Sequence, residues 1–132
     1  MLNPVSNSIT VLVVDDSPPF RARVKRHLNE ADGGILVVGE AEDGLAALRE
    51  VERLQPDVVL LDLHMPGVDG FRVLHYVKER LAQTAVIVLT SDASEGVRQR
   101  CAILRADAVI DKRDATSSLL PALRQLCARR LV

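Results

Sequence analysis

The side chains best suited to chemistry are three carboxylates, a hydroxyl and an ammonium, spread widely along the chain. In order, they belong to Asp15 and Asp16, Asp62, Thr90 and Lys112. If the fold brings them together, the carboxylates repel one another, and one takes up a proton unless a cation lies between them. Mg²⁺ suits such a site, because it binds a few carboxylates, keeps waters and accepts a phosphoryl oxygen. One carboxylate can then attack phosphorus to form an aspartyl-phosphate, while the ammonium and the hydroxyl face the phosphoryl oxygens.

These residues end or follow short runs of β-branched and aliphatic residues. The runs lie at 9–14, 35–39, 58–61, 85–89 and 108–110, and both alternate sets of residues in them are apolar. That pattern is typical of strands buried on both faces of a parallel sheet. Segments with apolar residues at helical spacing separate the runs. The sequence therefore predicts five β/α units and a doubly wound α/β fold, which binds ligands at the carboxyl ends of its strands.

Small polar residues mark the expected helix starts. Ser17 precedes a proline and predicts the N-cap of the first helix, and Ser94 predicts the N-cap of the fourth. Either Ser117 or Ser118 is expected to cap the fifth helix. Pro121 would then fall in the first turn of that helix, where its missing N–H is tolerated.

Length and composition limit the range of functions. At 132 residues, 48% hydrophobic and 27% charged, the chain is expected to form one domain over 9–128, with an N-terminal extension at 1–8 and a C-terminal end at 129–132. A net charge of −1 and an aromatic content of 2% argue against direct nucleic-acid binding. The chain lacks a long apolar segment and a signal peptide, so we expect a cytoplasmic location without membrane insertion.

Four stretches together resemble the receiver domain of two-component response regulators, in the manner of the single-domain chemotaxis regulators. They are VLVVDDS at 11–17, VVLLDLHMPGVDG at 58–70, AVIVLTSD at 85–92 and AVIDK at 108–112. The resemblance implies a (βα)5 flavodoxin-like fold with strand order 2-1-3-4-5. It also implies a phosphorylatable switch that is not an enzyme in the usual sense, although it catalyses its own phosphorylation and slow autodephosphorylation.

The resemblance also implies the phospho-acceptor and the metal ligands. Asp62 would accept the phosphoryl group. Mg²⁺, or Mn²⁺ in its place, would be held by Asp15, Asp16, Asp62 and the backbone carbonyl of His64. Gly70 would begin the third helix at a point where a side chain does not fit.

The remaining site residues would act on the phosphoryl group. Lys112 would pair with Asp62 beforehand and then with the phosphoryl group. Thr90 would hydrogen-bond a phosphoryl oxygen and move toward it on activation. Three neighbouring side chains would modulate the site, chiefly by controlling how water reaches the phosphoryl group: His64, Ser91 and Asp92.

Two positions depart from the family pattern. Val109 stands where the family usually has a Tyr or Phe that swings inward as Thr90 moves, so the aromatic part of the switch is missing. Arg113 stands where many receivers have a proline with a cis peptide bond. Because a non-proline cis bond costs about 3 kcal/mol, we expect a trans bond there and another means of orienting Lys112.

The resemblance implies partners as well. A sensor histidine kinase or a histidine phosphotransfer protein would donate the phosphoryl group, docking on the first helix near Phe20. A downstream protein partner would bind the face of the fourth helix, fifth strand and fifth helix. There Arg98, Arg100 and Arg105 either contact the partner or stay solvated. The chain would be a monomer or a phosphorylation-dependent dimer.

Three alternatives remain open. The chain is either a complete regulator or the receiver fragment of a longer protein with an output domain. A dehalogenase-type aspartyl-phosphate hydrolase also uses an Asp, a Thr, a Lys and Mg²⁺, but it needs a second carboxylate where His64 stands. A nucleotide-binding module would need a glycine-rich loop after the first strand, where the sequence reads DDSPPF.

Overall fold

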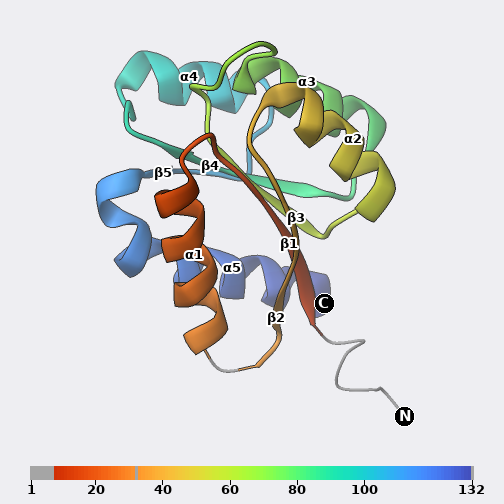
Figure 1. The fold of residues 1–132 in the computed structure, drawn as a ribbon, viewed down its shortest axis with the longest axis vertical. Coiled ribbons are helices and arrows are strands. Elements are labelled where there is room, and N and C mark those ends of the chain that lie inside the picture. The colour runs from red at the N-terminus through yellow and green to blue at the C-terminus, as the bar shows by residue number, and fades with distance from the viewer. Residues whose placement is uncertain (1–7, 32, 132) are drawn as a thin grey trace.

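The strands form one parallel sheet in the order β2-β1-β3-β4-β5 (Figure 1), in a computed structural model that describes residues 8–31 and 33–131. The strands are β1 (Ile9–Val14), β2 (Ile35–Ala41), β3 (Val58–Leu61), β4 (Ala85–Thr90) and β5 (Ala108–Asp111). The helices are α1 (Pro18–Glu30), α2 (Gly44–Leu54), α3 (Gly70–Arg80), α4 (Glu95–Ile103) and α5 (Ala115–Leu131), with a 3₁₀ helix, η2 (Lys112–Asp114), before α5. The predicted α/β fold and its strand order are confirmed.

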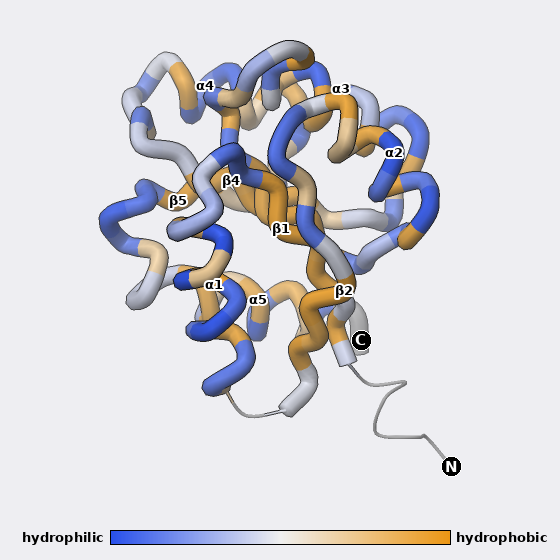
Figure 2. Tube along the Cα trace, in the orientation of Figure 1, coloured by the Kyte–Doolittle hydropathy of each residue, from blue (hydrophilic) through white to orange (hydrophobic). Residues whose placement is uncertain are grey.

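The sheet is buried on both faces because its central strands are apolar at successive positions. In β1, Val11 and Val13 belong to the core that α1 and α5 cover, whereas Leu12 and Val14 belong to the core under α2, α3 and α4. Figure 2 shows the hydrophobic strands enclosed by helices that carry hydrophilic residues on their outer sides. Burial on two faces explains why both alternate sets of strand residues are apolar.

The helix caps predicted at Ser17 and Ser94 are confirmed. The Ser17 hydroxyl oxygen accepts a hydrogen bond from the backbone N–H of Phe20 at 3.3 Å, and that of Ser94 accepts one from Val97 at 3.4 Å. Each bond satisfies a backbone donor that the first turn of a helix leaves without a partner. These caps fix where the loops after β1 and β4 turn into helices.

The start predicted for the fifth helix is wrong. The carboxylate of Asp111 accepts the N–H of Arg113 and caps η2, so the chain is already helical when α5 begins at Ala115. Ser117 and its neighbour therefore lie inside the helix, and the Ser117 hydroxyl donates to the carbonyl of Asp114 at 3.1 Å. Pro121 lies inside α5, beyond its first turn.

The chain ends and the peptide bonds complete the description. Of the expected N-terminal extension, Ser8 alone lies within the described residues, and the last residue of the C-terminal end lies outside them. Within residues 8–31 and 33–131 no peptide bond is cis, in agreement with the expectation at Arg113. None of the described helices is both long and apolar enough to cross a membrane.

Candidate functional site

The predicted site residues lie at the carboxyl ends of four adjacent strands. Asp15 and Asp16 follow β1, Asp62 follows β3, Thr90 is the last residue of β4, and Lys112 follows β5. The strand register brings two of these ends level, because Val14 pairs with Leu61 and the N–H of Asp62 donates to the carbonyl of Val14 at 2.9 Å. Asp15 and Asp62 are therefore neighbours across the sheet edge.

The three carboxylates form one cluster. A carboxylate oxygen from each of Asp15, Asp16 and Asp62 lies within 4.8 Å of the others. Asp15 and Asp62 are buried, whereas Asp16 is exposed. The cluster thus combines two desolvated acids with one that solvent reaches, which leaves it open on one side.

Asp62 is the carboxylate whose surroundings most disfavour its charge. Burial raises its pKa above the usual value, and the nearby charges of Asp15 and Asp16 raise it further. Two contacts act in the opposite direction. The N–H of His64 donates to Oδ1 of Asp62 at 3.2 Å, and the ammonium of Lys112 lies 3.5 Å from its Oδ2. These contacts compensate only part of the cost of burying the charge.

The loop after β3 folds tightly against the backbone of Asp62. A Cβ on Gly70 would lie 2.6 Å from the carbonyl oxygen of Asp62 and 2.5 Å from Cα of Leu63. Both distances are too short for a real contact, and both involve backbone atoms. The expectation that no side chain fits at the start of α3 is confirmed.

Lys112 lies between two of the carboxylates but closer to Asp15. Its Nζ is 2.7 Å from Oδ2 of Asp15 and 3.5 Å from Oδ2 of Asp62. The other oxygen of Asp15 accepts the N–H of Ser17 at 2.8 Å. Oδ2 of Asp15 accepts no hydrogen bond from any described residue, so its contact with the ammonium is an ion pair without good hydrogen-bond alignment. The ammonium also lies 4.5 Å from the ring centroid of Phe20.

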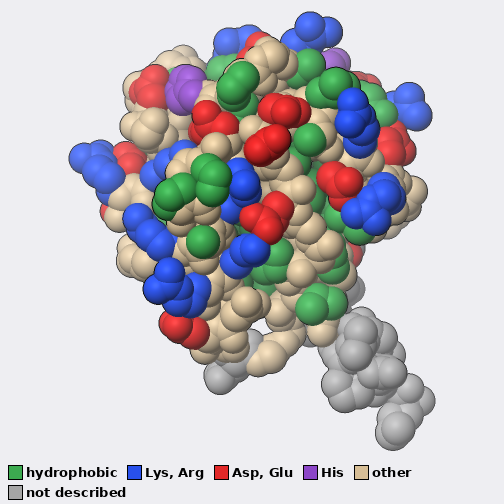
Figure 3. All heavy atoms as spheres, in the orientation of Figure 1, with side chains coloured by type: hydrophobic (Ala, Val, Ile, Leu, Met, Phe, Trp, Pro, Cys, Tyr) green, Lys and Arg blue, Asp and Glu red, His purple; other side chains and the backbone are tan. Residues whose placement is uncertain are grey.

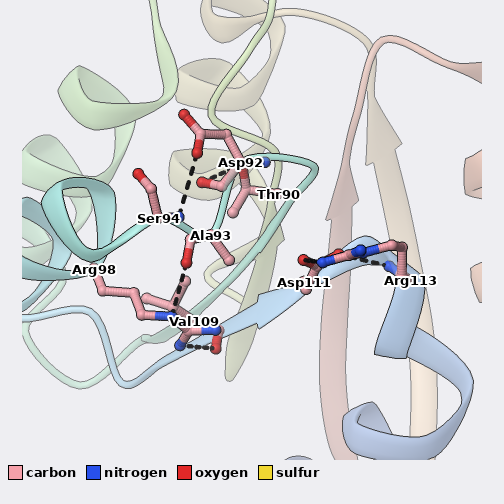
Figure 4. A network of polar contacts seen from close by, with 8 residues as sticks. All are labelled: Thr90, Asp92, Ala93, Ser94, Arg98, Val109, Asp111 and Arg113. Carbon is pink, nitrogen blue, oxygen red and sulfur yellow. Dashed lines mark hydrogen bonds and ion pairs between the residues drawn. The ribbon is translucent and has the colours of Figure 1, made fainter.

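Thr90 is buried and hydrogen-bonded within the loop that follows it (Figure 4). Its Oγ1 accepts the N–H of Asp92 at 3.0 Å and donates to the carbonyl of Asp92 at 3.4 Å. The carboxylate of Asp92 in turn accepts the N–H of Ser94 at 3.2 Å. The hydroxyl is therefore held by the loop that leads into α4.

The three residues predicted to modulate the site are all exposed: His64, Ser91 and Asp92. His64 is two residues beyond Asp62, and the other two directly follow Thr90. Their side chains are accessible to water on both sides of the strand ends that carry the acceptor and the hydroxyl.

Sequence reasoning left open whether Arg98 contacts a partner or is solvated, and it missed an internal role. Figure 4 shows its side chain reaching between the loop after β4 and strand β5. Nε donates to the carbonyl of Ala93 at 3.0 Å, and Nη1 donates to the carbonyl of Val109 at 3.1 Å. The sequence carries no signal for these bonds, since both acceptors are backbone atoms.

A second feature missed from sequence is the side-chain clamp between Asp111 and Arg113, also drawn in Figure 4. The guanidinium donates two hydrogen bonds to the carboxylate, from Nε at 3.1 Å and from Nη2 at 2.8 Å. These bonds and the Arg113 N–H lower the pKa of Asp111 to about 2. The clamp brackets Lys112 and holds its backbone in η2, although the family's proline is absent.

The surface of the described residues carries both signs of charge and several concavities. Figure 3 shows Lys and Arg interspersed with Asp and Glu on the visible face. A cavity of about 550 Å³ lies away from the acidic cluster, between α2, α3 and α4, with Phe71 and Tyr76 among its lining residues. The guanidinium of Arg100 lies over the Phe71 ring at 3.8 Å and partly fills that side of the cavity.

Comparison with known families decides the relationship. The family described as response regulator receiver domain matches residues 11–124. This chain belongs to that family. Protein-glutamate methylesterase/protein-glutamine glutaminase 5 of Myxococcus xanthus is similar to the receiver domain, with 46% identity over 105 residues, or 80% of this chain and 30% of that protein. A putative transcriptional regulator of Pseudomonas aeruginosa is 37% identical over 118 residues, which are 89% of this chain and 56% of the regulator.

Solved structures agree with the family assignment. The receiver domain of the putative response regulator NarL from Mycobacterium tuberculosis has a TM-score of 0.84 and 32% identity, with 92% of this chain and 97% of that chain covered. The response regulator domain of Thermotoga maritima CheB has a TM-score of 0.83 and 31% identity at the same coverage. This receiver domain spans 24% to 30% of the length of three methylesterase relatives that it matches.

Proposed function

We propose that this receiver domain takes a phosphoryl group from a phosphohistidine onto Asp62 and that the added charge changes its affinity for a partner protein. The observation that carries the proposal is the cluster of three carboxylates within 4.8 Å of one another, with one ammonium beside it. A phosphoryl group adds a charge of roughly −1.5 to −2 at neutral pH. That charge biases a domain that has two arrangements of its surface.

Mg²⁺ is the cofactor that fits the residues present, and Mn²⁺ is a suitable substitute. The donors are carboxylate oxygens, which hard divalent cations prefer. Oδ2 of Asp15 is buried and accepts no hydrogen bond, and its contact with a cation, the ammonium of Lys112 at 2.7 Å, shows that the site favours positive charge there. We propose that Asp15, Asp16 and Asp62 hold the ion, together with the backbone carbonyl of His64. When bound, the ion would neutralise charge on the carboxylates and on the phosphoryl oxygens.

The transfer step uses the chain's own residues in simple roles. An oxygen of Asp62 attacks phosphorus, the phosphorus–nitrogen bond of the donor breaks, and its electron pair stays on the imidazole. The ammonium of Lys112, already 3.5 Å from Asp62, faces the incoming negative charge. Thr90 would exchange its bonds with Asp92 for one to a phosphoryl oxygen, which would rearrange the loop into α4.

The partners follow from this chemistry. The donor would be a sensor histidine kinase or a histidine phosphotransfer protein, and α1 is the docking face that we propose for it. The downstream partner would be a protein that binds the face formed by α4, β5 and α5. A phosphorylation-dependent dimer is the alternative to a monomer that binds this partner.

The decisive experiment is intact mass measurement after incubation with Mg²⁺ and acetyl phosphate. We expect one phosphoryl adduct on the wild-type protein, and none without a divalent cation or in Asp62→Asn. Asp69→Asn is the matched control, because asparagine replaces the N-cap aspartate of α3 well and Asp69 is outside the carboxylate cluster. That variant should be labelled like wild type.

Two results would contradict the proposal. Absence of an adduct on wild-type protein, under conditions that label another receiver domain, would contradict the switch. Rapid multiple turnover of unrelated phosphomonoesters would instead favour the dehalogenase-type hydrolase.

A further inference from the structure

The ammonium of Lys112 lies against one of the few aromatic rings of this chain. The sequence has two Phe, one Tyr and no Trp. Nζ of Lys112 is 4.5 Å from the ring centroid of Phe20, inside the distance of about 6 Å at which the face of a ring attracts a cation. The other two rings, Phe71 and Tyr76, are on α3 and contact arginines.

The loop after β1 fixes where this ring lies. The backbone N–H of Phe20 donates to Oγ of Ser17 at 3.3 Å, and the N–H of Ser17 donates to Oδ1 of Asp15 at 2.8 Å. The other oxygen of Asp15 is the one that contacts Lys112. One carboxylate therefore anchors both the ammonium and the helix start that carries the ring.

The ring also packs against the hydrophobic core. Phe20 is half-buried and packs against the core that α1 and α5 share, where it lines a small cavity with Val24, Ala115 and Leu119. Because Phe20 is on α1 and both Ala115 and Leu119 are on α5, the ring lies between these two helices. Packing against this core supports the ring, and the guanidinium of Arg23 also lies 5.8 Å from its centroid.

We propose that Phe20 is a positioning residue for Lys112, an inference that rests on the proposed phosphoryl transfer to Asp62. The clamp between Asp111 and Arg113 fixes the backbone on each side of Lys112. The ammonium, however, lies at the end of a flexible four-carbon side chain, which the clamp does not restrain. The ring restrains that stem. It does so without a carboxylate, so a divalent cation that binds Asp15 and Asp62 does not compete for this contact.

This role differs from packing alone, and the variants separate the two. Phe20→Leu keeps an apolar side chain between the two helices but removes the face of the ring. Phe20→Tyr keeps the face. Phe71→Leu is the matched control, because it removes a ring with a cation at a shorter distance, Arg100 at 3.8 Å, away from the acidic cluster.

The first measurement is the rate of labelling by acetyl phosphate with saturating Mg²⁺, followed by intact mass. A small donor avoids any effect of α1 on kinase docking. We expect Phe20→Leu to lower the rate about threefold to tenfold, as loss of a partly buried cation–π contact would. Phe20→Tyr and Phe71→Leu should stay within about twofold of wild type on the same scale.

The second measurement is the side-chain NMR spectrum of Lys112. In wild type and Phe20→Tyr, a restrained stem should give two separate Hε signals that the ring shifts upfield. In Phe20→Leu they should merge at the position typical of a mobile lysine. Equal labelling rates in wild type and Phe20→Leu, or unshifted Hε signals in wild type, would overturn the inference while leaving Asp62 labelled. An unlabelled wild type would overturn the proposed function, and this inference with it.

Discussion

Arg98 on α4 donates a hydrogen bond to the backbone carbonyl of Val109 on β5, at 3.1 Å. The same guanidinium donates to the carbonyl of Ala93 at 3.0 Å, in the loop that holds the hydroxyl of Thr90 through Asp92. The position where the family usually has a mobile ring is thus tied by its backbone to the loop after β4. A movement of that loop would therefore displace a guanidinium that is also hydrogen-bonded to β5.

We expect Arg98→Ala to loosen this loop in the unphosphorylated protein. A hydrogen bond from a charged donor contributes about 1.5–3 kcal/mol, although exposure of Arg98 places its bonds at or below the lower end. The amides of Asp92 and Ser94 should therefore exchange with solvent deuterium about tenfold faster than in wild type. Native-state hydrogen exchange read by NMR measures both amides.

Arg105→Ala is the control for Arg98, since Arg105 pairs with the exposed Glu79 and does not contact the loop. That variant should leave the two amides unchanged. Arg98→Lys should protect the amides of Asp92 and Ser94 only in part, because a single ammonium replaces a planar guanidinium that donates to two carbonyls. Unchanged exchange in Arg98→Ala would show that the bonds of Arg98 do not hold the loop.

Gly70→Ala is expected to destabilise the fold and to disturb the acceptor. The added methyl would meet backbone atoms of Asp62 and Leu63 at 2.6 and 2.5 Å, and a backbone cannot turn aside as a side chain can. Overpacking of this kind costs about 1–3 kcal/mol. Urea unfolding should show that loss, and acetyl phosphate should label the variant more slowly than wild type.

Gly96→Ala gives the opposite result at a glycine with open surroundings. No atom lies within 4 Å of a Cβ added there, and the residue is in the first turn of α4. Alanine is favoured over glycine in a helix by up to about 1 kcal/mol. If both substitutions destabilised the protein equally, the close approach at Gly70 would not be the cause.

The fold and the membership of the site were predictable, whereas the contacts within the site were not. Strands with apolar residues in both alternate sets, separated by helical segments, left little choice but a doubly wound sheet, and the strand ends then placed the acids together. The preference of Lys112 for Asp15 over Asp62 depends on side-chain directions that spacing does not encode. The bonds of Arg98 end on backbone carbonyls, which every residue has.

The helix that was misplaced shows the same limit. Two adjacent serines before an apolar stripe predict an N-cap, but Asp111 caps η2 and makes the chain helical before it reaches them. That arrangement depends on Arg113 closing onto Asp111 from two residues away. Local composition favoured the serines as the N-cap, but the hydrogen bonds between Asp111 and Arg113 place the start of helical structure before them.

Asp62→Asn should stabilise the protein at neutral pH when no divalent cation is present. Burial raises the pKa of Asp62 above the ordinary aspartate value of 3.8, so the folded state binds this proton more tightly than the unfolded state does. The ionised group therefore costs stability as pH rises above 3.8, and the cost is complete once pH exceeds the raised pKa. Thermal unfolding at pH 7 should show a higher midpoint for the variant, and a gain that disappears below pH 3.8.

Mg²⁺ should reverse this difference. A ligand that binds only the folded state raises stability by RT ln(1 + [L]/Kd), and the wild-type cluster offers one more carboxylate than Asp62→Asn does. Titration with MgCl₂ at pH 7 should raise the unfolding midpoint of wild type more than that of the variant. Equal responses would mean that Asp62 is not among the ligands.

His64 and Asp92 are expected to set the lifetime of the phosphorylated state. Both side chains are exposed, one two residues beyond Asp62 and the other two beyond Thr90, and we expect them to border the path by which water reaches the phosphoryl group. His64→Ala removes an imidazole from that border and should speed hydrolysis by about threefold, a change of less than 1 kcal/mol in the activation barrier. Decay of the labelled protein after removal of acetyl phosphate, followed by intact mass, measures the rate.

His75→Ala, which removes an exposed imidazole from α3, should leave the decay unchanged. Asp92→Asn keeps an oxygen that can accept the Ser94 N–H, so a change in its decay rate would be due to charge rather than to a collapsed loop. If neither His64→Ala nor Asp92→Asn altered the decay, control of water would have to lie with the buried residues of the site.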